Sequence, residues 1–202
     1  MSWDNSLLEE FAEKNMLVAG VDEVGRGALF GSVVAASVVV TLADLVKLVD
    51  IGVKDSKKLS SKKRQELVRP IKEIAADWQI SYASVAEIDN LNILQASLLA
   101  MKRSIEQLKL SPELCLVDGK IPIPELSISQ KTVIKGDMRS PAIAAASILA
   151  KVWRDDLITN LAVKYPEYDL AANKGYPTKK HRLALRKYGA SLEHRRSFKL
   201  NF

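Results

Sequence analysis

The chain has 202 residues, a length that favours one compact domain, and we expect residues 1–202 to form it. Hydrophobic residues make up 48% of the chain and charged residues 27%, which excludes a disordered or collagen-like protein. The net charge is +6, and no apolar run approaches the roughly 20 residues that cross a bilayer, so a transmembrane protein is excluded as well.

The amino terminus and the single cysteine both bear on the cellular compartment. Residues 1–16 contain four acids and lack the basic start and apolar centre of an export signal. Cys115 has no second cysteine to pair with and lies in the apolar run LCLV, which predicts an inert thiol in the core. We therefore expect a cytoplasmic protein.

The first half of the chain predicts a hairpin, a helix and a further strand. Residues 17–22 form a short apolar run that ends in acids and then Gly-Arg-Gly, which is typical of a buried strand entering a tight loop. The valine-rich residues 31–40 predict its hairpin partner. Ser60 or Ser61 is expected to cap a helix, and the alternation over residues 80–85 predicts another strand.

The second half continues with alternating helices and short strands. A helix is predicted over residues 91–108, followed by strands at 114–117 and 132–134. Ser140 and Pro141 then supply an N-cap and a first-turn proline for a long helix. These elements predict a three-layer α/β domain with a mixed sheet flanked by helices.

Four acidic residues lie at the ends of these predicted elements. Asp22 and Glu23 follow the first strand directly, Asp118 follows a later strand, and Asp137 comes just before the long helix. Ligands gather at strand ends in open α/β sheets, so we expect the four carboxylates to converge. Carboxylates that lie close together repel one another unless hard cations neutralise them. Two Mg²⁺ or Mn²⁺ ions about 3.5–4 Å apart would do so and would support phosphodiester cleavage.

Each of the four acids alone also fits a structural role, as a turn residue or a helix cap. Asp137 favours a ligand role most clearly, because the serine and proline that open the helix already supply its capping chemistry. Asp155 and Asp156 are rivals for the fourth position, but they lie about 22–25 Å further along the same helix. Surface pairing with Arg154 suits them better.

The loop after the first strand contains Gly25, Arg26 and Gly27. A dinucleotide-binding loop is excluded, because carboxylates precede the glycines and a strand, not a helix, follows them. The glycines would let backbone N–H groups approach a sugar-phosphate chain, with Arg26 as a charged fork for a phosphate. A plain hairpin turn is compatible with the same residues.

Positive charge is concentrated in two segments. Residues 174–202 contain nine basic residues and one acid, whereas residues 1–173 contain 21 basic and 23 acidic residues. Residues 54–64, which include Lys57 and Lys58, contain six cations and one acid. Each cluster alone also fits a solvated helix face, but two clusters beside the carboxylates indicate a polyanionic ligand.

Six segments extend this pattern over nearly the whole chain and resemble, in order, the motifs of bacterial type 2 ribonuclease H, ribonuclease HII. They are VDEVGRGALFG (21–31), DSKKLS (55–60), VDGK (117–120), KGDMRSPAIAAASILAKVWRD (135–155), KGYPTKKH (174–181) and HRRSF (194–198). The resemblance implies a ribonuclease H-like fold in a single catalytic domain. Residues 15–165 would form its core, and residues 166–202 a basic, helical, substrate-binding segment.

The resemblance also implies an activity: an endonuclease that cuts the RNA strand of RNA–DNA hybrids and cuts at single ribonucleotides in duplex DNA. Metal-activated water would leave a 3′-hydroxyl and a 5′-phosphate. Its roles in primer removal during replication and in ribonucleotide excision repair are expected together. The implied metal ligands are Asp22, Glu23, Asp118 and Asp137, and the implied junction-recognising loop is Gly25, Arg26 and Gly27.

The remaining substrate contacts follow from the same resemblance and from charge. Tyr176 matches the tyrosine that stacks beside the RNA–DNA junction, and we expect Lys57, Lys58 and the cations of residues 174–199 to contact phosphates. His181 and His194 are expected as phosphate contacts or surface residues, because a metal-activated water needs no histidine base.

Two departures from the family pattern are visible. Ala28 and Ser32 stand where prolines are common, which predicts a looser glycine loop. The chain ends at Phe202 without an obvious appended docking peptide, so neither a clamp-binding partner nor an obligate protein partner is expected, and we predict a monomer. Two alternatives stay open on the residues alone: another metal-dependent nuclease of this fold acting on DNA, and a nucleic-acid-binding module without catalysis.

Overall fold

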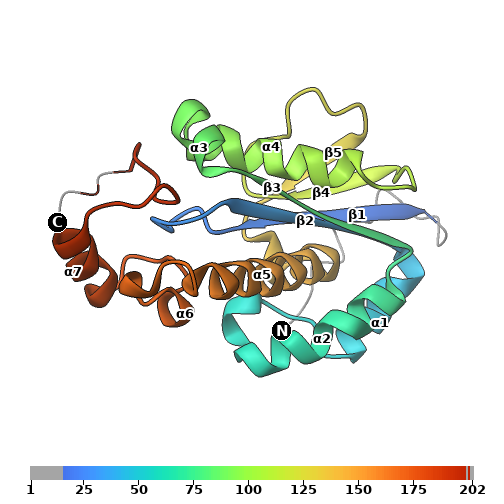
Figure 1. Ribbon diagram of the computed structural model, residues 1–202. Coiled ribbons are helices and arrows are strands. Elements are labelled where there is room, and N and C mark those ends of the chain that lie inside the picture. Colours follow the sequence, from blue (N-terminus) through green and yellow to red (C-terminus); the bar gives the residue numbers. More distant parts are fainter. Residues whose placement is uncertain (1–15, 199, 201–202) are drawn as a thin grey trace.

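The computed structural model describes residues 16–198 and 200. The acids before Met16, which bear on the predicted absence of an export signal, lie outside the described residues, as do Lys199, Asn201 and Phe202. A five-stranded mixed sheet forms the centre of the molecule, in the order β3-β2-β1-β4-β5 (Figure 1). The strands are β1 (Leu17–Val24), β2 (Val33–Thr41), β3 (Asp77–Ala83), β4 (Leu114–Asp118) and β5 (Ser129–Val133).

Helices cover both faces of this sheet. They are α1 (Leu45–Asp50), α2 (Ser61–Ile74), α3 (Val85–Leu91), α4 (Ile93–Glu106), α5 (Pro141–Ala162), α6 (Leu170–Asn173) and α7 (Lys179–Tyr188). Helix α5 packs on one face with α1 and α2 outside it, and α3 and α4 cover the other face (Figure 1). Within the described part of the chain, no helix is both long enough and apolar enough to cross a membrane. The predicted three-layer arrangement with a mixed sheet is confirmed.

The sheet combines a hairpin with parallel strands. Strand β1 pairs antiparallel with β2 along its length, from Leu17↔Thr41 to Val24↔Val34, which confirms the predicted hairpin. Strand β3 pairs antiparallel with the outer edge of β2, whereas β4 pairs parallel with β1, and β5 with β4. Strands β1 and β4 are therefore neighbours that end at the same edge of the sheet.

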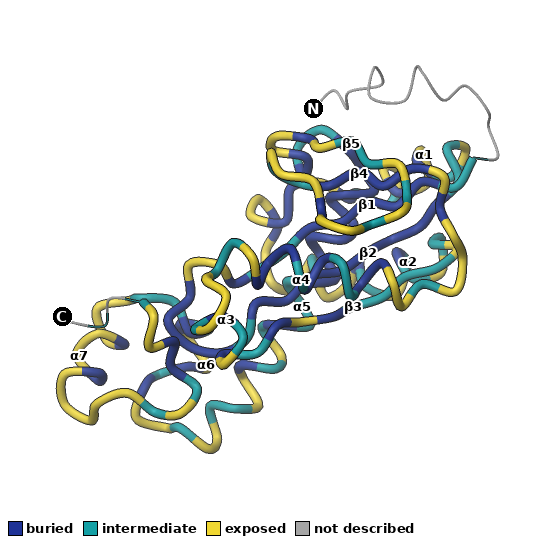
Figure 2. Tube along the Cα trace, turned by 90° about the horizontal axis from the view of Figure 1, so that it is seen from above, coloured by how far each residue is buried: buried dark blue, intermediate teal, exposed yellow. Residues whose placement is uncertain are grey.

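The core lies between the sheet and its two helical layers, where Figure 2 shows a buried centre. Residues 33–40 of β2 are all buried because this inner strand is covered on both faces. Gly20 of β1 marks the closest approach of a helix: a Cβ there would lie 2.2 Å from the Ala142 carbonyl carbon. Only glycine at this position lets the start of α5 rest directly on β1.

Several predicted boundaries differ from the structure: β5, predicted at residues 132–134, spans Ser129–Val133, and local capping explains two others. The strand predicted at residues 80–85 spans Asp77–Ala83, because Ser84 and Glu87 form a capping box that places Val85 in helix α3. The helix predicted over residues 91–108 is α4, which spans Ile93–Glu106 and is preceded by the separate helix α3. Asn92, with φ 75°, ends α3, and its side chain accepts hydrogen bonds from the first backbone N–H groups of α4. By contrast, Ser60 caps α2, as one of the two serines predicted for that role.

The carboxy-terminal segment extends the molecule beyond one end of the sheet, with α6 beside the end of α5 and α7 at the tip (Figures 1 and 2). The loop between β1 and β2 meets this segment through backbone hydrogen bonds. Leu29 N–H donates to the Gly175 carbonyl at 2.8 Å, and Arg195 N–H donates to the Leu29 carbonyl at 2.9 Å. The glycine loop and the basic segment, which are distant in sequence, therefore form one structural unit.

Candidate active site

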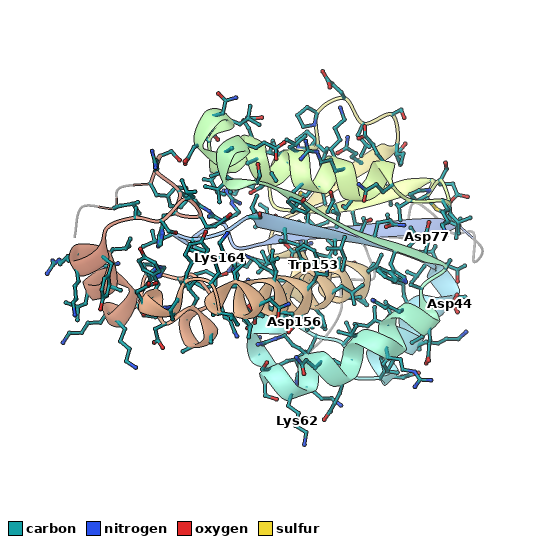
Figure 3. The ribbon with its side chains drawn as sticks, viewed as in Figure 1. Asp44, Lys62, Asp77, Trp153, Asp156 and Lys164 are labelled. Carbon is teal, nitrogen blue, oxygen red and sulfur yellow. The ribbon has the colours of Figure 1, made fainter. Side chains whose placement is uncertain are left out.

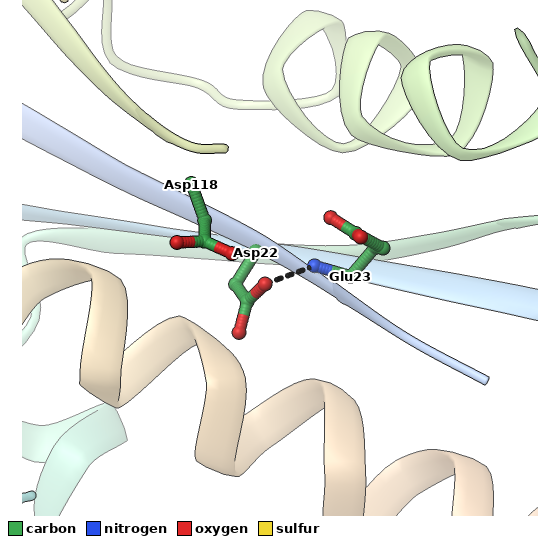
Figure 4. A group of neighbouring side chains, drawn as sticks. All are labelled: Asp22, Glu23 and Asp118. Atoms are coloured by element: carbon green, nitrogen blue, oxygen red, sulfur yellow. Dashed lines mark hydrogen bonds between the residues drawn. The ribbon is translucent and has the colours of Figure 1, made fainter. Parts of the chain in front are cut away.

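Three acidic side chains meet at the carboxyl ends of β1 and β4. Val21 of β1 is paired with Val117 of β4, so the next residue on each strand is an aspartate. Ligand oxygens of Asp22, Glu23 and Asp118 lie within 4.8 Å of one another (Figure 4). The parallel register of two strands thus produces the convergence that was expected from their sequence positions.

The alternation of a strand explains how neighbouring residues serve the same site. Asp22 points toward α5 and Glu23 points away from it (Figure 4). Glu23 N–H donates to Asp22 Oδ1 at 2.7 Å, and Gly136 N–H donates to Asp118 Oδ1 at 2.6 Å. Backbone N–H groups therefore hold the Asp22 and Asp118 carboxylates.

The electrostatics of this cluster favour a positive ligand. Burial raises the pKa of Asp22 well above its usual range, and repulsion by Glu23 and Asp118 raises it further. Burial also raises the pKa of Glu23 and of Asp118. A hydrogen bond from Ser147 of α5 opposes the shift at Asp22. The donor set consists of carboxylate oxygens, which are the ligands that Mg²⁺ and Mn²⁺ prefer, so the residues present fit a hard divalent cation.

Asp137, the fourth predicted ligand, lies one residue beyond the Gly136 that contacts Asp118. It is buried in a short 3-10 helix (Gly136–Met138), outside the group of three, and its Oδ2 is 3.1 Å from Lys57 Nζ. Ser140 was expected to cap α5 with its side chain, and this expectation is wrong. Its side chain makes no capping hydrogen bond, and its hydroxyl is buried without a partner. Nor is the Asp137 carboxylate free.

The two predicted lysines stand at different places relative to the acids. Both lie on a 3-10 helix (Ser56–Lys58) that Arg64 fixes by donating to the Ser56 and Leu59 carbonyls. Lys57 reaches Asp137 with a side chain that is 82% exposed. Lys58 instead lies 4.0 Å from Asp55. The structure thus brings Lys57, and not Lys58, to the carboxylates.

The glycine loop lies beside the acids. Gly25 has φ +95°, and a Cβ there would lie 2.2 Å from Arg154 Nε, so glycine is required on both counts. Arg26 is exposed, and its Nη1 is 3.1 Å from Glu23 Oε1. A Cβ at Gly27 would meet nothing within 4 Å. The loop therefore presents open backbone and one guanidinium next to the carboxylates.

Two fully buried arginines, Arg154 and Arg195, hold this loop from beneath. Their guanidinium groups donate to five backbone carbonyls. The acceptors are Phe30, Ser32 and Lys174 for Arg154, at 3.0, 3.1 and 2.9 Å, and Arg26 and Gly31 for Arg195, at 3.0 and 2.9 Å. The loop is thus restrained without prolines at positions 28 and 32. Sequence reasoning missed this role, since nothing local separates these arginines from surface cations.

Several sequence assignments change as a result. Arg154 is not a surface partner of Asp155, which pairs with Lys151 at 2.7 Å. Asp156 lies on the exposed side of α5 (Figure 3). Arg195, expected among the phosphate contacts, is buried, and burial together with repulsion by Arg154 lowers its pKa to about 9.

Tyr176 lies next to this unit, where the basic segment meets α5. Its ring is half-buried, with the Arg154 guanidinium carbon 5.4 Å and Lys151 Nζ 5.5 Å from the ring centre. The prediction for the two histidines is wrong: His181 and His194 are both fully buried and hydrogen-bond to each other. Neither is available to a phosphate.

A cavity of about 250 Å³ adjoins the acids on the α4 side. Glu23, Arg26 and Asp118 line its polar end, together with Gly119 and Lys120. Side chains of α4 form the opposite wall. The site therefore has acids and a guanidinium at one end and an apolar wall at the other.

Comparisons with known proteins agree with this arrangement. A family model described as Ribonuclease HII matches residues 19–202. Ribonuclease HII of Trichormus variabilis is 62% identical over 183 residues, which cover 91% of this chain and 81% of the relative. Ribonuclease HII of Vibrio campbellii is 48% identical over 190 residues, which cover 94% and 87%.

Solved structures show the same similarity in three dimensions. Ribonuclease H2 from Pyrococcus horikoshii OT3 superposes with a TM-score of 0.77 at 29% identity, over 92% of this chain and 95% of that chain. RNase HII from Archaeoglobus fulgidus, solved in a complex with PCNA, gives a TM-score of 0.77 at 30% identity over the same shares. With the motifs, the sheet order and the acidic cluster in agreement, the chain belongs to the ribonuclease HII family of nucleases and has the ribonuclease H-like fold.

Proposed function

We propose that this protein hydrolyses the RNA strand of RNA–DNA hybrids and cuts at single ribonucleotides within duplex DNA, leaving a 3′-hydroxyl and a 5′-phosphate. The observation that carries the proposal is the meeting of three carboxylates, the buried Asp22 and the half-buried Glu23 and Asp118, at the ends of two parallel strands. Burial and mutual repulsion make this cluster unfavourable alone, so a ligand of opposite charge belongs there.

Asp22, Glu23, Asp118 and Asp137 are the proposed ligands of Mg²⁺ or Mn²⁺. When bound, such ions supply Lewis acidity that activates water and stabilises the leaving oxygen of a phosphodiester. The chain supplies the positioning: backbone N–H groups of Glu23 and Gly136 hold the Asp22 and Asp118 carboxylates. Lys57 holds Asp137 beside them.

The glycine loop and Tyr176 are the proposed readers of the ribonucleotide. The 2′-hydroxyl is the group that distinguishes RNA from DNA, and the backbone of Gly25, Arg26 and Gly27, which is exposed at Arg26 and Gly27, would supply hydrogen-bonding groups for it. Tyr176 would stack on the nucleotide next to the ribonucleotide, because bases and sugars present flat or apolar faces to an aromatic ring. Lys57, Lys58 and the cations of residues 174–199 other than the buried Arg195 would contact phosphates.

A matched pair of substrates tests the proposal. Two duplexes of identical sequence, one carrying a single ribonucleotide, are incubated with the protein in Mg²⁺ or Mn²⁺, and the products are mapped. We expect one cut beside the ribonucleotide and an intact all-DNA duplex. Equal cutting of both duplexes would favour a DNA nuclease, and salt-sensitive binding without product would favour a binding module.

The biological setting stays a prediction. A cytoplasmic monomer without an obligate protein partner, acting in primer removal and ribonucleotide excision repair, is proposed from the family resemblance. The PCNA complex belongs to the Archaeoglobus relative. Light scattering on the purified protein, with and without the hybrid, would measure the oligomeric state directly.

A further inference from the structure

The two histidines of the chain form a buried hydrogen-bonded pair behind Tyr176. His181 lies on α7 and His194 lies in the segment that follows it, and both are fully buried. His181 Nε2 and His194 Nε2 are 3.0 Å apart. His181 Nδ1 is 2.9 Å from the Tyr176 carbonyl, and Ser191 N–H points at His194 Nδ1 over 3.0 Å.

The two ends of this chain of hydrogen bonds determine where every proton lies. A backbone N–H only donates, so His194 Nδ1 accepts from Ser191 N–H, and the Ser191 hydroxyl, 2.8 Å from the same nitrogen, must then act as a donor too. The neutral His194 ring therefore carries its proton on Nε2. That proton is donated to His181 Nε2, which leaves the His181 proton on Nδ1. His181 Nδ1–H then donates to the Tyr176 carbonyl, which only accepts. With both rings neutral and in opposite tautomers, each N–H group in this chain of hydrogen bonds has an acceptor.

The hydrogen bonds from Ser191 through His194 and His181 to the Tyr176 carbonyl are called the histidine relay here. Packing around His194 connects this relay to the glycine loop. The ring contacts Phe30 of that loop edge-on at 5.0 Å between centroids, and Tyr168 at 4.6 Å. Backbone bridging between Phe30 and His194 joins the same two segments. Tyr176 O also accepts from Thr178 N–H at 2.8 Å, but that donor moves with the turn itself. The Leu29–Gly175 backbone hydrogen bond holds the residue before Tyr176 to the loop, and the two histidines add a connection from the Tyr176 carbonyl itself.

We propose that His181 and His194 are positioning residues: they fix the Tyr176 backbone relative to the glycine loop, so that the ring and the loop read the same ribonucleotide junction. This inference rests on the proposed function of Tyr176. It makes the pair a specificity determinant and not a source of catalytic protons, because neither ring is exposed to substrate.

The tautomers are tested first, without substrate. The chain contains only two histidines, so long-range ¹H–¹⁵N spectra of histidine-labelled protein at neutral pH give two assignable rings. We expect His181 with its proton on Nδ1 and His194 with its proton on Nε2. Two rings in the same tautomer, or either ring charged at pH 7, would overturn the relay.

The positioning role is tested by the preference for a junction, measured as kcat/KM on a single-ribonucleotide duplex divided by kcat/KM on a continuous hybrid. We expect His181→Leu to lower this ratio roughly tenfold, equivalent to ~1.4 kcal/mol, in the same direction as Tyr176→Ala. His181→Asn, whose side-chain amide replaces the Nδ1–H donor to Tyr176, should recover most of the loss. His194→Gln keeps an Nε2 donor and serves as the milder variant if His181→Leu fails to fold.

A matched control separates positioning from stability. Leu185→Ala removes a buried side chain from the same helix and the same apolar cluster, and it should lower Tm while leaving the ratio unchanged. An unchanged ratio in His181→Leu with a lowered ratio in Tyr176→Ala would overturn the relay alone. An unchanged ratio in Tyr176→Ala would overturn the proposed role of Tyr176, and no cutting of the ribonucleotide duplex would overturn the proposed function itself.

Discussion

The acidic cluster and the unit beneath the glycine loop bury charge in opposite ways. At the ends of β1 and β4, three carboxylates repel one another, and burial raises the pKa of each. Beneath the loop, Arg154 and Arg195 are buried as well, yet their guanidinium groups donate to five backbone carbonyls. The carboxylates keep repelling one another until a cation binds, whereas the two guanidinium groups already have most of their hydrogen-bond acceptors.

The difference separates the part of the site that binds from the part that positions. A cluster with unfavourable internal repulsion gains most from a ligand and contributes little to stability. A buried cation that donates to several backbone carbonyls fixes the backbone around it. Substitutions in the two regions should therefore change different measured quantities.

The largest expected effect is on catalysis, at the acidic cluster. Asp118→Asn removes one negative ligand oxygen and should lower turnover about a thousandfold or more, or ~4 kcal/mol, while the affinity for the ribonucleotide duplex changes little. Single-turnover cleavage and filter binding measure the two quantities. Unchanged turnover in Mg²⁺ would refute a metal role for Asp118.

Arg195 is expected to give the largest effect on stability. Arg195→Met leaves the Arg26 and Gly31 carbonyls without their donor, and we expect the free energy of unfolding to fall by about 2–4 kcal/mol. Urea unfolding measures it. The adjacent exposed Arg196→Met is the matched control and should change it by less than about 0.5 kcal/mol. Equal effects of the two substitutions would remove Arg195 from the supporting unit.

At Asp22, stability and activity should move in opposite directions. Because the folded state raises the pKa of Asp22, it binds protons more readily than the unfolded chain, so the stability contributed by this group falls as pH rises above about 4. Asp22→Asn should therefore raise the metal-free stability at pH 7 by about 1–2 kcal/mol and abolish cleavage. Thermal unfolding without divalent ions measures the gain, with exposed Asp156→Asn as control. A loss of stability in Asp22→Asn would contradict this account.

The histidine pair predicts the opposite pH dependence. Burial, followed by repulsion from His181, lowers the pKa of His194 to about 4, so the stability it contributes is present above pH ~6.5 and is lost as pH falls toward 4. Asp169 lies near His181 and partly opposes the shift there. Unfolding between pH 4 and 7 should show a slope up to ~1.4 kcal/mol per pH unit steeper in the wild type than in His194→Gln. Parallel curves would contradict it.

The smallest expected effect is at Lys58, which stands apart from the carboxylates. Lys58→Ala should weaken duplex binding about uniformly across sequences and reduce the slope of log affinity against log salt by about 1. Lys62 on the outer part of α2 (Figure 3) offers a comparison in the same basic cluster. An unchanged slope in Lys58→Ala would exclude a phosphate contact by this residue.

Local patterns in the sequence predicted much of the fold. The hairpin of β1 and β2 and the strand that carries Asp118 follow from apolar runs bounded by polar residues, and Ser60 caps α2 as one of two candidates. The capping box at Ser84 and Glu87 was a readable signal for the start of α3, but the alternation before it extended the predicted strand too far.

The site was predictable where two strand ends determined it and unpredictable where tertiary contacts did. Asp22 and Asp118 follow paired strands, so their convergence depends only on a parallel register. The burial of His181, His194 and Arg195 depends on the carboxy-terminal segment folding back onto the glycine loop. A basic sequence such as HRRSF carries no local signal that distinguishes a buried guanidinium from an exposed one.

Calorimetric titration of the wild-type protein with Mn²⁺, in buffers of different ionisation enthalpy, tests the central claim most directly. Because carboxylates with raised pKa values must lose their protons to bind a metal, we expect binding accompanied by proton release near pH 5, and loss of both in Asp118→Asn. Binding of the same strength in Asp118→Asn, or no binding by the wild type, would contradict the assignment of these carboxylates as a metal site.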